Sequence, residues 1–211
     1  MTASDPIVYV IDDEAPIRDS LAMLLRSVGL ASALFPDAPS FLAAAPWQNH
    51  ACVIADVRMP GMSGLELQDA LRTRGSALPM IVVTGHGDIG MAVRAMKNGA
   101  ADFIEKPFNG QVLLDAVHRA LALAAAPPAG PSTSAEGDRA ELERRIATLS
   151  PREREVMTLV AQGLPNKSVA TRLDLSTRTV EVHRAKVMEK MGARSLAELV
   201  RMNIAAELLI P

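Results

Sequence analysis

The sequence predicts two domains of different class, a doubly wound α/β domain with a five-stranded parallel sheet followed by an all-α domain. In the first half, apolar runs that end in turn signals alternate with segments of helical period, which is typical of a parallel sheet covered by helices on both faces. The second half shows helical periods alone, in short pieces separated by Gly and Pro. A chain of 211 residues is long enough for two small domains.

The predicted elements of the first half follow one another regularly. The strands are the apolar runs Ile7–Ile11, Ala31–Phe35, Ala51–Ala55, Met80–Val83 and Asp102–Ile104. The helices between and after them are Ala15–Val28, Ala38–Ala45, Gly64–Arg74, Ile89–Asn98 and Gln111–Ala125. Asp37 and Ser63 are expected to cap helix N-termini. Gly29 and Gly99 are expected at helix C-termini.

The composition changes after the last of these helices. Residues 125–138 are rich in Ala, Pro, Gly and Ser, so we expect a mobile or semi-extended linker there, with a short charged helix at Arg139–Ala147. Ser150 and Glu153 then form a predicted capping box around Pro151 at the first helical position. We therefore place the first domain at 1–125, a partly helical linker at 126–148 and the second domain at 149–211.

The composition is that of a soluble globular protein, with 49% hydrophobic and 22% charged residues. A single cysteine, Cys52, excludes an intramolecular disulfide, and its apolar neighbours predict a buried strand residue. The N-terminus does not read as a signal peptide, and no run approaches the roughly 20 apolar residues that cross a bilayer. We therefore expect a cytoplasmic protein without a membrane partner.

The net charge of −2 hides an asymmetry between the two halves. Up to Ala124 there are nine Lys or Arg against thirteen Asp or Glu, whereas from Ser150 onward there are ten against seven. An acidic half followed by a basic half indicates two partners of different kinds.

Asp, Thr and Lys residues stand at the ends of four of the five predicted strands. Asp12 and Asp13 follow the first strand, Asp56 the third, Thr84 the fourth and Lys106 the fifth. Ligands of open α/β sheets bind at the carboxyl ends of the strands, so we expect these side chains to meet. Crowded carboxylates need a hard cation, and an all-oxygen ligand set suits Mg²⁺.

This set of residues favours phosphoryl transfer onto an aspartate. A cation beside a carboxylate neutralises charge on phosphoryl oxygens while the carboxylate attacks phosphorus. Lys106 can pair with the same group, and the Thr84 hydroxyl can donate a hydrogen bond to it. Taken singly, each residue reads as a turn former, a helix cap or a solvated lysine. Their occurrence at successive strand ends favours a site.

Residues 7–125 resemble the receiver domain of two-component response regulators. The resemblance rests on Val10–Glu14, Asp56–Gly64, Val83–Asp88 and Phe103–Phe108. It implies a flavodoxin-like fold in which Asp56 accepts a phosphoryl group from a sensor histidine kinase. It also implies that Asp12, Asp13, Asp56 and the backbone carbonyl of Arg58 hold Mg²⁺. Thr84 and Lys106 would contact the phosphoryl group, and the Lys106–Pro107 bond would be cis.

The resemblance also implies how phosphorylation is signalled. Thr84 would move towards the phosphate while Phe103, an aromatic residue of the fifth strand, turns inward, unless Phe103 is an ordinary half-buried strand residue. Val93 and Lys97 fall where related receivers form a dimer. Arg58 and His86 flank the phosphorylation site and would tune hydrolysis, or are simply exposed loop residues.

The second half carries helical apolar stripes and a basic segment. Between Leu164 and Arg194 there are seven Lys or Arg against three Asp or Glu. A short join at Leu173–Ser176 connects two predicted helices, with Ser176 or Thr177 as the N-cap of the second. This arrangement fits a helix-turn-helix whose positive second helix contacts DNA phosphates. Charge alone would equally fit a solvated face on a helix that binds another partner.

Residues 149–205 resemble the LuxR-type DNA-binding domain. Together with the receiver they indicate the FixJ/NarL class, and both halves are most similar in sequence to FixJ. The resemblance rests on the segments Leu149–Val156, Gly163–Ala170 and Leu175–His183. The resemblance implies a four-helix domain with Thr177–Met191 as the recognition helix and Ser195–Leu209 as a last helix that supports dimer contacts. The implied DNA-binding residues are Asn166, Lys167, Arg178, Thr179, Glu181, Val182, Arg184, Ala185 and Lys186.

Among these residues, Glu181, Val182 and Ala185 would face base edges, whereas the basic residues and the Asn166–Lys167 turn would grip phosphates. Glu181 either accepts a hydrogen bond from cytosine N4 or pairs with a neighbouring arginine.

We therefore expect a transcriptional regulator that is not an enzyme. Phosphorylation would promote a homodimer on double-stranded promoter DNA, with RNA polymerase as a further partner. Two alternatives remain open. The helical domain could bind RNA or protein, or the first domain could be an aspartate-dependent phosphatase of the haloacid dehalogenase type. That phosphatase class carries its nucleophile on the first strand in an Asp-x-Asp arrangement, whereas here Asp12 and Asp13 are adjacent.

Overall fold

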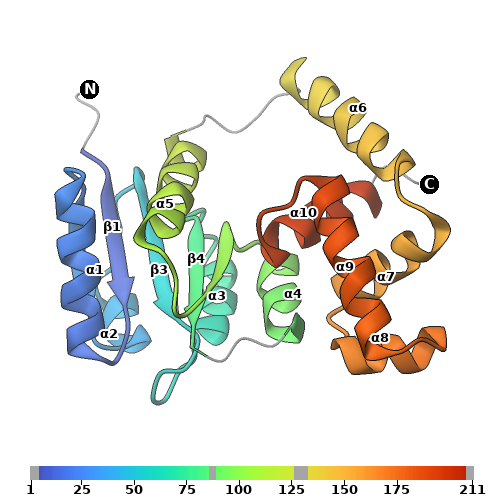
Figure 1. Ribbon diagram of the computed structural model, residues 1–211. Helices are drawn as coiled ribbons and strands as arrows, with labels where there is room; N and C mark the ends of the chain where they lie inside the picture. The colour runs from blue at the N-terminus through green and yellow to red at the C-terminus, as the bar shows by residue number, and fades with distance from the viewer. Residues whose placement is uncertain (1–4, 86–88, 126–132, 208–211) are drawn as a thin grey trace. The chain divides into compact units, whose positions relative to one another are not determined.

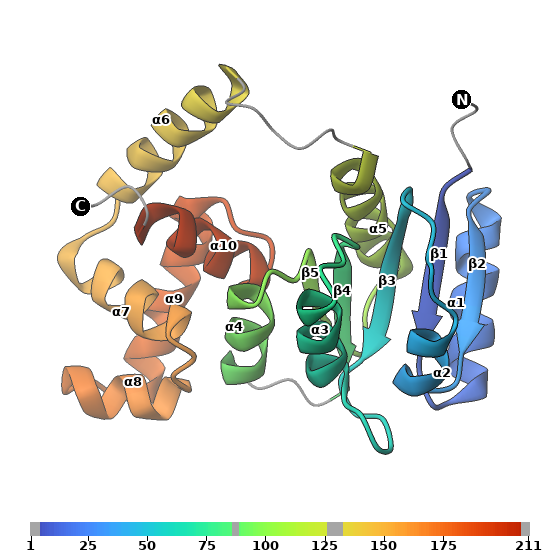
Figure 2. The same cartoon turned by 180° about the vertical axis from the view of Figure 1, so that it is seen from behind.

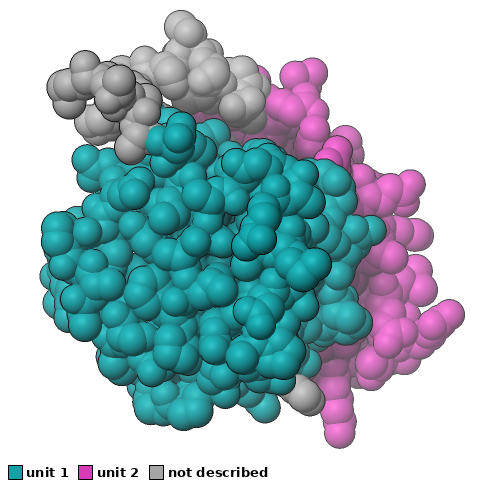
Figure 3. Space-filling view, turned by 90° about the vertical axis from the view of Figure 1, so that its left-hand side faces the viewer, with its two compact units in different colours: residues 1–86, 98–127 teal, residues 87–97, 128–211 magenta. Residues whose placement is uncertain are grey.

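The computed structural model describes residues 5–85, 89–125 and 133–207. Contacts divide the chain into two units, residues 1–86 with 98–127 and residues 87–97 with 128–211. Figure 3 colours the two units separately. Each unit has its own hydrophobic core. Among the helices of the described residues, none has both the length and the apolarity that crossing a bilayer requires.

The first unit is built on a five-stranded sheet. Its strands are β1 (Ile7–Ile11), β2 (Ala31–Phe35), β3 (Ala51–Asp56), β4 (Met80–Thr84) and β5 (Asp102–Glu105). The order across the sheet is β2-β1-β3-β4-β5, and every pairing is parallel. The predicted doubly wound parallel sheet is therefore confirmed. The last three strands each extend one residue beyond their predicted ends, into the polar residues that follow.

Helices cover both faces of this sheet (Figures 1 and 2). In this unit they are α1 (Ala15–Ser27), α2 (Ala38–Ala43), α3 (Gly64–Thr73) and α5 (Gly110–Ala125). The helices α1 and α5 lie on one face, where α1 packs on β1 and β2 and α5 packs on β3, β4 and β5. On the other face α2 packs on β2 and α3 on β4.

The core under α1 and α5 follows from the strand pattern. Alternate residues of one strand point to the same face, so Val8 and Val10 of β1 lie beside Cys52 and Ile54 of β3. All six residues of β3 are buried, as expected for a central parallel strand. Burial raises the pKa of the Cys52 thiol to about 12, so this side chain is an unreactive core residue, as predicted.

The expected caps are present. Asp37 accepts a hydrogen bond from the Ser40 backbone at the start of α2. At the start of α3, Ser63 and Glu66 form a reciprocal capping box. Gly29 and Gly99 have φ values of 77° and 89°, the left-handed conformation expected at helix C-termini.

The second unit is helical. It contains α4 (Ile89–Lys97), α6 (Thr133–Ala147), α7 (Pro151–Ala161), α8 (Asn166–Leu173), α9 (Thr177–Met191) and α10 (Leu196–Glu207). Apolar stripes from α7, α8 and α9 meet in its core, as their spacing predicted. Leu208 and Leu209, which the prediction placed in the last helix, lie outside the described residues.

Two helices of this unit differ from the boundaries expected from sequence. The helix α4 lies within the predicted first domain, yet contacts group it with the second unit, where it packs on α10. The helix α6 begins at Thr133 rather than at Arg139, inside the stretch expected to be extended. Leu142 and Ile146 of α6 pack against the core of the unit, which gives this charged helix a partner.

An ion pair between a buried glutamate and an exposed lysine joins two helices of the second unit. Glu153 of α7, which is 4% exposed, accepts hydrogen bonds from Lys190 of α9 at 2.6 Å and from the Ser150 backbone at 2.8 Å. The hydrogen bond from Lys190, followed by that from the Ser150 backbone, lowers the pKa of Glu153 from 4.5 to about 2. A folded-state pKa below the unfolded value contributes stability above pH 4.5, and this contribution is lost as the pH falls towards 2.

We predict that Glu153→Gln removes this part of the acid sensitivity. The free energy of unfolding of the wild type should fall more steeply between pH 4.5 and 2 than that of the variant, because only the wild type takes up this proton. Urea unfolding followed by circular dichroism across this range measures both slopes. The control is Glu155→Gln, which changes an exposed glutamate of the same helix. Parallel curves for Glu153→Gln and the wild type would contradict the prediction.

Candidate functional site

The direction in which the chain adds strands to the sheet reverses between β1 and β3. From β1 the chain crosses to β2 on one side, whereas β3 and the later strands follow on the other side. Crevices at the carboxyl ends of such strands are the usual ligand sites of open α/β sheets. Asp12 directly follows β1 and Asp56 is the last residue of β3, so both carboxylates lie at this point.

Lys106 joins the two carboxylates. Its Nζ donates to Asp12 Oδ2 at 2.9 Å and to Asp56 Oδ1 at 2.8 Å. Asp12 and Asp56 are 3% and 7% exposed, so both charges depend on this cation. Partial burial alone would lower the pKa of Lys106, but its hydrogen bonds to Asp12 and Asp56 and their charges outweigh burial and raise the pKa. The lysine therefore stays protonated across the neutral range.

Backbone groups fix the orientation of both carboxylates. The Arg58 N–H donates to Asp56 Oδ2 at 2.6 Å, and the Glu14 N–H donates to Asp12 Oδ1 at 2.9 Å. The Lys106 N–H donates to the Thr84 carbonyl at 2.7 Å, which ties the lysine to the end of β4. The Lys106–Pro107 peptide bond is cis, as the resemblance implied.

Two residues of this site were not predicted from sequence. Arg18 of α1 donates a hydrogen bond to the Asp12 backbone carbonyl. Gly64 begins α3 where the helix meets the backbone of Asp56, and a Cβ there would lie 2.3 Å from the Asp56 carbonyl oxygen. A glycine directly after the Ser63 N-cap is the sequence signal for this close approach.

The remaining predicted residues of the pocket differ in exposure. Thr84 is fully buried at the end of β4, and Phe103 on β5 is 9% exposed. Asp13 and the side chain of Arg58 are exposed. His86 lies outside the described residues. The structure thus brings Asp12, Asp56 and Lys106 into direct contact. It leaves the roles of the others as predictions.

The donor atoms at the pocket fit a magnesium ion. Within the part of the chain that is described, no three His, Cys, Asp or Glu side chains are grouped as a metal cage. Magnesium commonly takes only one or two carboxylates and keeps several waters. Asp12 and Asp56 offer carboxylate oxygens that contact one Lys106 ammonium group, and the set contains no sulfur or imidazole donor. The residues present therefore suit this ion.

The two residues predicted for a receiver dimer lie on α4. Val93 is 4% exposed, and its side chain lies 3.7 Å from the position that a Cβ on Gly163 would take. Lys97, at the end of the same helix, is exposed. Their role in a dimer stays a prediction.

A second candidate site lies on α9. Arg178, Glu181, Val182, Ala185 and Lys186 are all exposed. Their spacing of three to four residues places them on one face of the helix. Val180, Val187 and Met191 lie on the opposite face and are buried in the core. The helix therefore presents a mixed polar and basic stripe outward.

The helix-turn-helix joint is well defined. The helix α8 ends at Asp174 in the left-handed conformation, with φ 55°, and Ser176 caps α9 by accepting from the Thr179 backbone. Thr179 also shares a hydroxyl–hydroxyl hydrogen bond of 2.8 Å with Ser176, so its side chain already serves the cap. Ser176 is thus the N-cap among the two predicted candidates.

The other predicted DNA-binding residues make contacts within the unit. Arg184 donates to Asn166 Oδ1 at 3.4 Å, and its burial lowers its pKa. Arg178 pairs with Glu181 at 3.5 Å across one turn. Of the two interpretations of Glu181, pairing with a neighbouring arginine therefore occurs in the DNA-free protein. Lys167 is exposed at the start of α8.

We predict that Gly64→Ala destabilises the first unit, because its methyl group would collide with the backbone of Asp56. Overpacking of this kind typically costs about 1–3 kcal/mol of unfolding free energy. The fluorescence of Trp47, the only tryptophan, reports on this unit during urea unfolding, since its ring stacks on Phe41. The matched control is Gly85→Ala, whose methyl group would meet no atom within 4 Å. Equal midpoints for the two variants would show that α3 tolerates the methyl group.

Comparison with known proteins gives two family matches. The response regulator receiver domain matches residues 8–118, and the luxR family of bacterial regulatory proteins matches residues 147–203. The transcriptional regulatory protein FixJ of Bradyrhizobium diazoefficiens is 46% identical over 202 residues, which cover 96% of each chain. FixJ of Rhizobium meliloti is 48% identical and covers 96% of this chain and 97% of its own. The C4-dicarboxylate transport transcriptional regulatory protein DctR of Rhodobacter capsulatus is 46% identical, with 93% and 98% covered.

Solved structures give the same relationship over nearly the whole chain. Full-length FixJ from B. japonicum is 46% identical, with a TM-score of 0.54 and coverage of 98% of this chain and 99% of that one. The response regulator StyR is 41% identical, with a TM-score of 0.55 and coverage of 95% and 99%. The chain therefore belongs to the response regulators that join a receiver domain to a luxR-family DNA-binding domain, and it is a transcriptional regulator of that family.

Proposed function

We propose that Asp56 is the phosphoacceptor of this regulator and that a sensor histidine kinase is the donor. The observation that carries the proposal is the pairing of Lys106 with both Asp56 and Asp12, at 2.8 and 2.9 Å. This pairing places a fixed positive charge beside the carboxylate that would receive a phosphoryl group. The family matches support it, because receiver domains take their phosphoryl group from histidine kinases.

The transfer needs one bond to form and one to break. A carboxylate oxygen of Asp56 attacks phosphorus, the phosphorus–nitrogen bond of the donor phosphohistidine breaks, and the nitrogen keeps the electron pair. Lys106, held protonated by its raised pKa, pairs with the phosphoryl oxygens that replace part of its contact with Asp56. The Arg58 N–H orients the carboxylate by holding Oδ2. A magnesium ion held by Asp12, Asp13, Asp56 and the Arg58 carbonyl would neutralise charge on those oxygens.

The output of this reaction is DNA binding by α9. Glu181, Val182 and Ala185 face base edges, whereas Arg178 and Lys186 with Asn166, Lys167 and Arg184 contact phosphates. Thr179 contributes at the helix N-terminus. The exposed stripe of α9 supports this assignment, because a recognition helix must present its side chains outward to enter the major groove.

Phosphorylation would be coupled to DNA binding through dimerisation. Thr84 and Phe103 respond to the phosphoryl group, and a surface that includes Val93 and Lys97 pairs with its equivalent in a second copy. Two DNA-binding domains then occupy neighbouring half-sites of a promoter, where RNA polymerase can be engaged.

We predict that Asp56→Asn abolishes phosphorylation. The wild type with Mg²⁺ and acetyl phosphate should gain the mass of one phosphoryl group, and with beryllofluoride it should sediment as a dimer. The amide cannot form the acyl phosphate, so the variant should do neither. Intact-mass spectrometry and analytical ultracentrifugation measure the two effects.

The control for this experiment is Asp19→Asn, which changes an exposed aspartate of α1 and should behave as the wild type. Persistent phosphorylation of the Asp56→Asn protein would move the acceptor elsewhere. A phosphorylated wild type that remains monomeric would leave Asp56 in its role and contradict the coupling through dimerisation.

We predict that Lys186→Ala weakens duplex DNA binding through loss of one phosphate contact. The slope of log affinity against log salt should decrease by about one unit, because one fewer counterion is released. Fluorescence anisotropy with a labelled duplex between low and physiological salt measures this slope. The control Arg72→Ala removes one exposed positive charge from α3 and should leave the slope unchanged. Tighter binding to single-stranded RNA than to duplex DNA would favour the alternative partner for the helical domain.

A further inference from the structure

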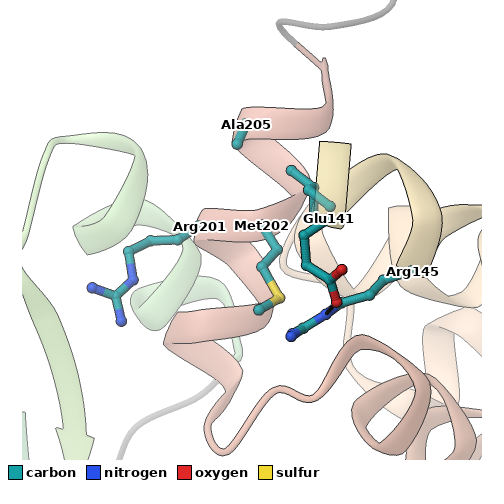
Figure 4. A pocket seen from close by; sticks show the side chains of 6 residues that line it. Glu141, Arg145, Arg201, Met202 and Ala205 are labelled. Carbon is teal, nitrogen blue, oxygen red and sulfur yellow. Dashed lines mark hydrogen bonds and ion pairs between the residues drawn. The ribbon is translucent and has the colours of Figure 1, made fainter. Parts of the chain in front are cut away.

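The helix α6 reaches the end of the recognition helix through one side chain. Arg145 Nε donates to Glu141 Oε1, four residues earlier on α6, at 2.9 Å. Its Nη1 donates to the backbone carbonyl of Met191 at 2.8 Å. Figure 4 shows Glu141 and Arg145 side by side, with the guanidinium group directed away from its own helix. Met191 is the last residue of α9, so the contact lies at the C-terminus of the recognition helix.

The chemistry of a helix end favours this contact. The last carbonyl groups of an α-helix have no partner within the helix and carry the negative end of its dipole. A guanidinium group supplies both a donor and a positive charge, so Arg145 caps α9 from a different helix. Glu141 lies on the other side of the guanidinium group and limits the directions in which it can point.

Gly192 leaves the space that Arg145 occupies. It follows α9 in the left-handed conformation, with φ 65°. A Cβ at this position would lie 2.8 Å from Arg145 Nη1. The left-handed conformation favours Gly or Asn at this position, and only glycine also leaves the guanidinium group of Arg145 in its place.

A second polar contact holds the same turn of α9. Lys190 Nζ donates to the Thr148 carbonyl at 3.1 Å, directly after α6, and to Glu153 Oε2 at 2.6 Å. The last turn of the recognition helix is thus fixed by α6, by the residue that follows it and by α7. The stripe that faces DNA lies nearer the other end, between Arg178 and Lys186.

The helices α6 and α10 do not pack closely along their whole length. A hollow of about 340 Å³ lies between the two helices, lined by Glu141, Leu142, Arg145, Arg201, Met202 and Ala205 (Figure 4). Leu142 and Ile146 pack against the core of the unit. The contact between α6 and α9 therefore combines this apolar packing with the directional hydrogen bond from Arg145 to Met191.

We infer that α6 is a working part of the DNA-binding unit and that Arg145 is a positioning residue for the recognition helix. The matched luxR-family region begins at residue 147, after Arg145, so nothing in the family match assigns this role. The helix α6 is also the first described element after residues 126–132, which connect it to α5. A displacement of α6 would change the Arg145–Met191 contact and reorient α9. This inference rests on the proposed DNA-binding function.

The test uses the full-length chain and a duplex selected by the wild type from a random pool, together with a scrambled duplex of equal composition. We expect Arg145→Ala to weaken binding to the selected duplex about tenfold, the effect of losing one charged hydrogen bond. Binding to the scrambled duplex should be unchanged, because its phosphates do not require a fixed helix orientation. Arg145→Lys keeps a charge and a donor and should restore most of the preference.

A second variant separates position from stability. Gly192→Asn keeps a residue that accepts the left-handed conformation, but its Cβ would displace the guanidinium group of Arg145. It should reduce the preference for the selected duplex as much as Arg145→Ala does, and the double variant should lose no more than either one alone. The control Arg139→Ala removes another exposed arginine of α6, one that pairs with Glu143 rather than with Glu141, and should bind both duplexes as the wild type does.

Four outcomes would overturn the inference. Wild-type preference in Arg145→Ala, or an equal loss on both duplexes, would show that Arg145 does not orient α9. Additive losses in the double variant would show that Gly192 and Arg145 act independently. A wild type that enriches no duplex from the random pool would overturn the DNA-binding function itself, and the inference with it.

Discussion

Asp12 and Asp56 are buried at the ends of neighbouring parallel strands and share the ammonium group of Lys106. Two buried carboxylates without a nearby cation would repel each other and lose their hydration, so this contact decides whether the strand ends can come together. Other features of the first unit also hold these two carboxylates in place. Gly64 lets α3 approach the Asp56 backbone, and backbone N–H groups hold the remaining carboxylate oxygens. A phosphoryl group arriving at Asp56 would enter a site already organised around negative charge.

The helix α9, the proposed recognition helix, also has charged side chains fixed at its C-terminal end. Its exposed stripe is free of the core, whereas its last turn is held by Lys190 on one side and Arg145 on the other. One end of α9 is thus available for a ligand while the other is fixed in orientation. The pKa of Glu153 is about 2, so its carboxylate stays charged throughout the neutral pH range.

Local sequence determined much of both sites. Continuous apolar runs placed the five strands, and helical periods placed most helices, within a few residues, because strands buried on both faces and amphipathic helices require those patterns. The residues at the strand ends identified Asp12, Asp56 and Lys106, since parallel strands bring their carboxyl ends to one edge. Capping signals placed the N-cap of α9 at Ser176 or Thr177, within one residue of the observed Ser176, because an N-cap acts within a single turn.

Only the tertiary structure decided which distant groups meet. Arg145 and Met191 are joined across three helix boundaries, and no local pattern marks a guanidinium group that caps a helix other than its own. The composition of residues 125–138 predicted a mobile or semi-extended linker, but α6 starts at Thr133, within that stretch, and its later residues Leu142 and Ile146 pack on the core of the second unit. The sequence determined each element and its chemistry through local periodicity. Contacts between elements were settled by packing and charge pairing, which depend on the whole fold.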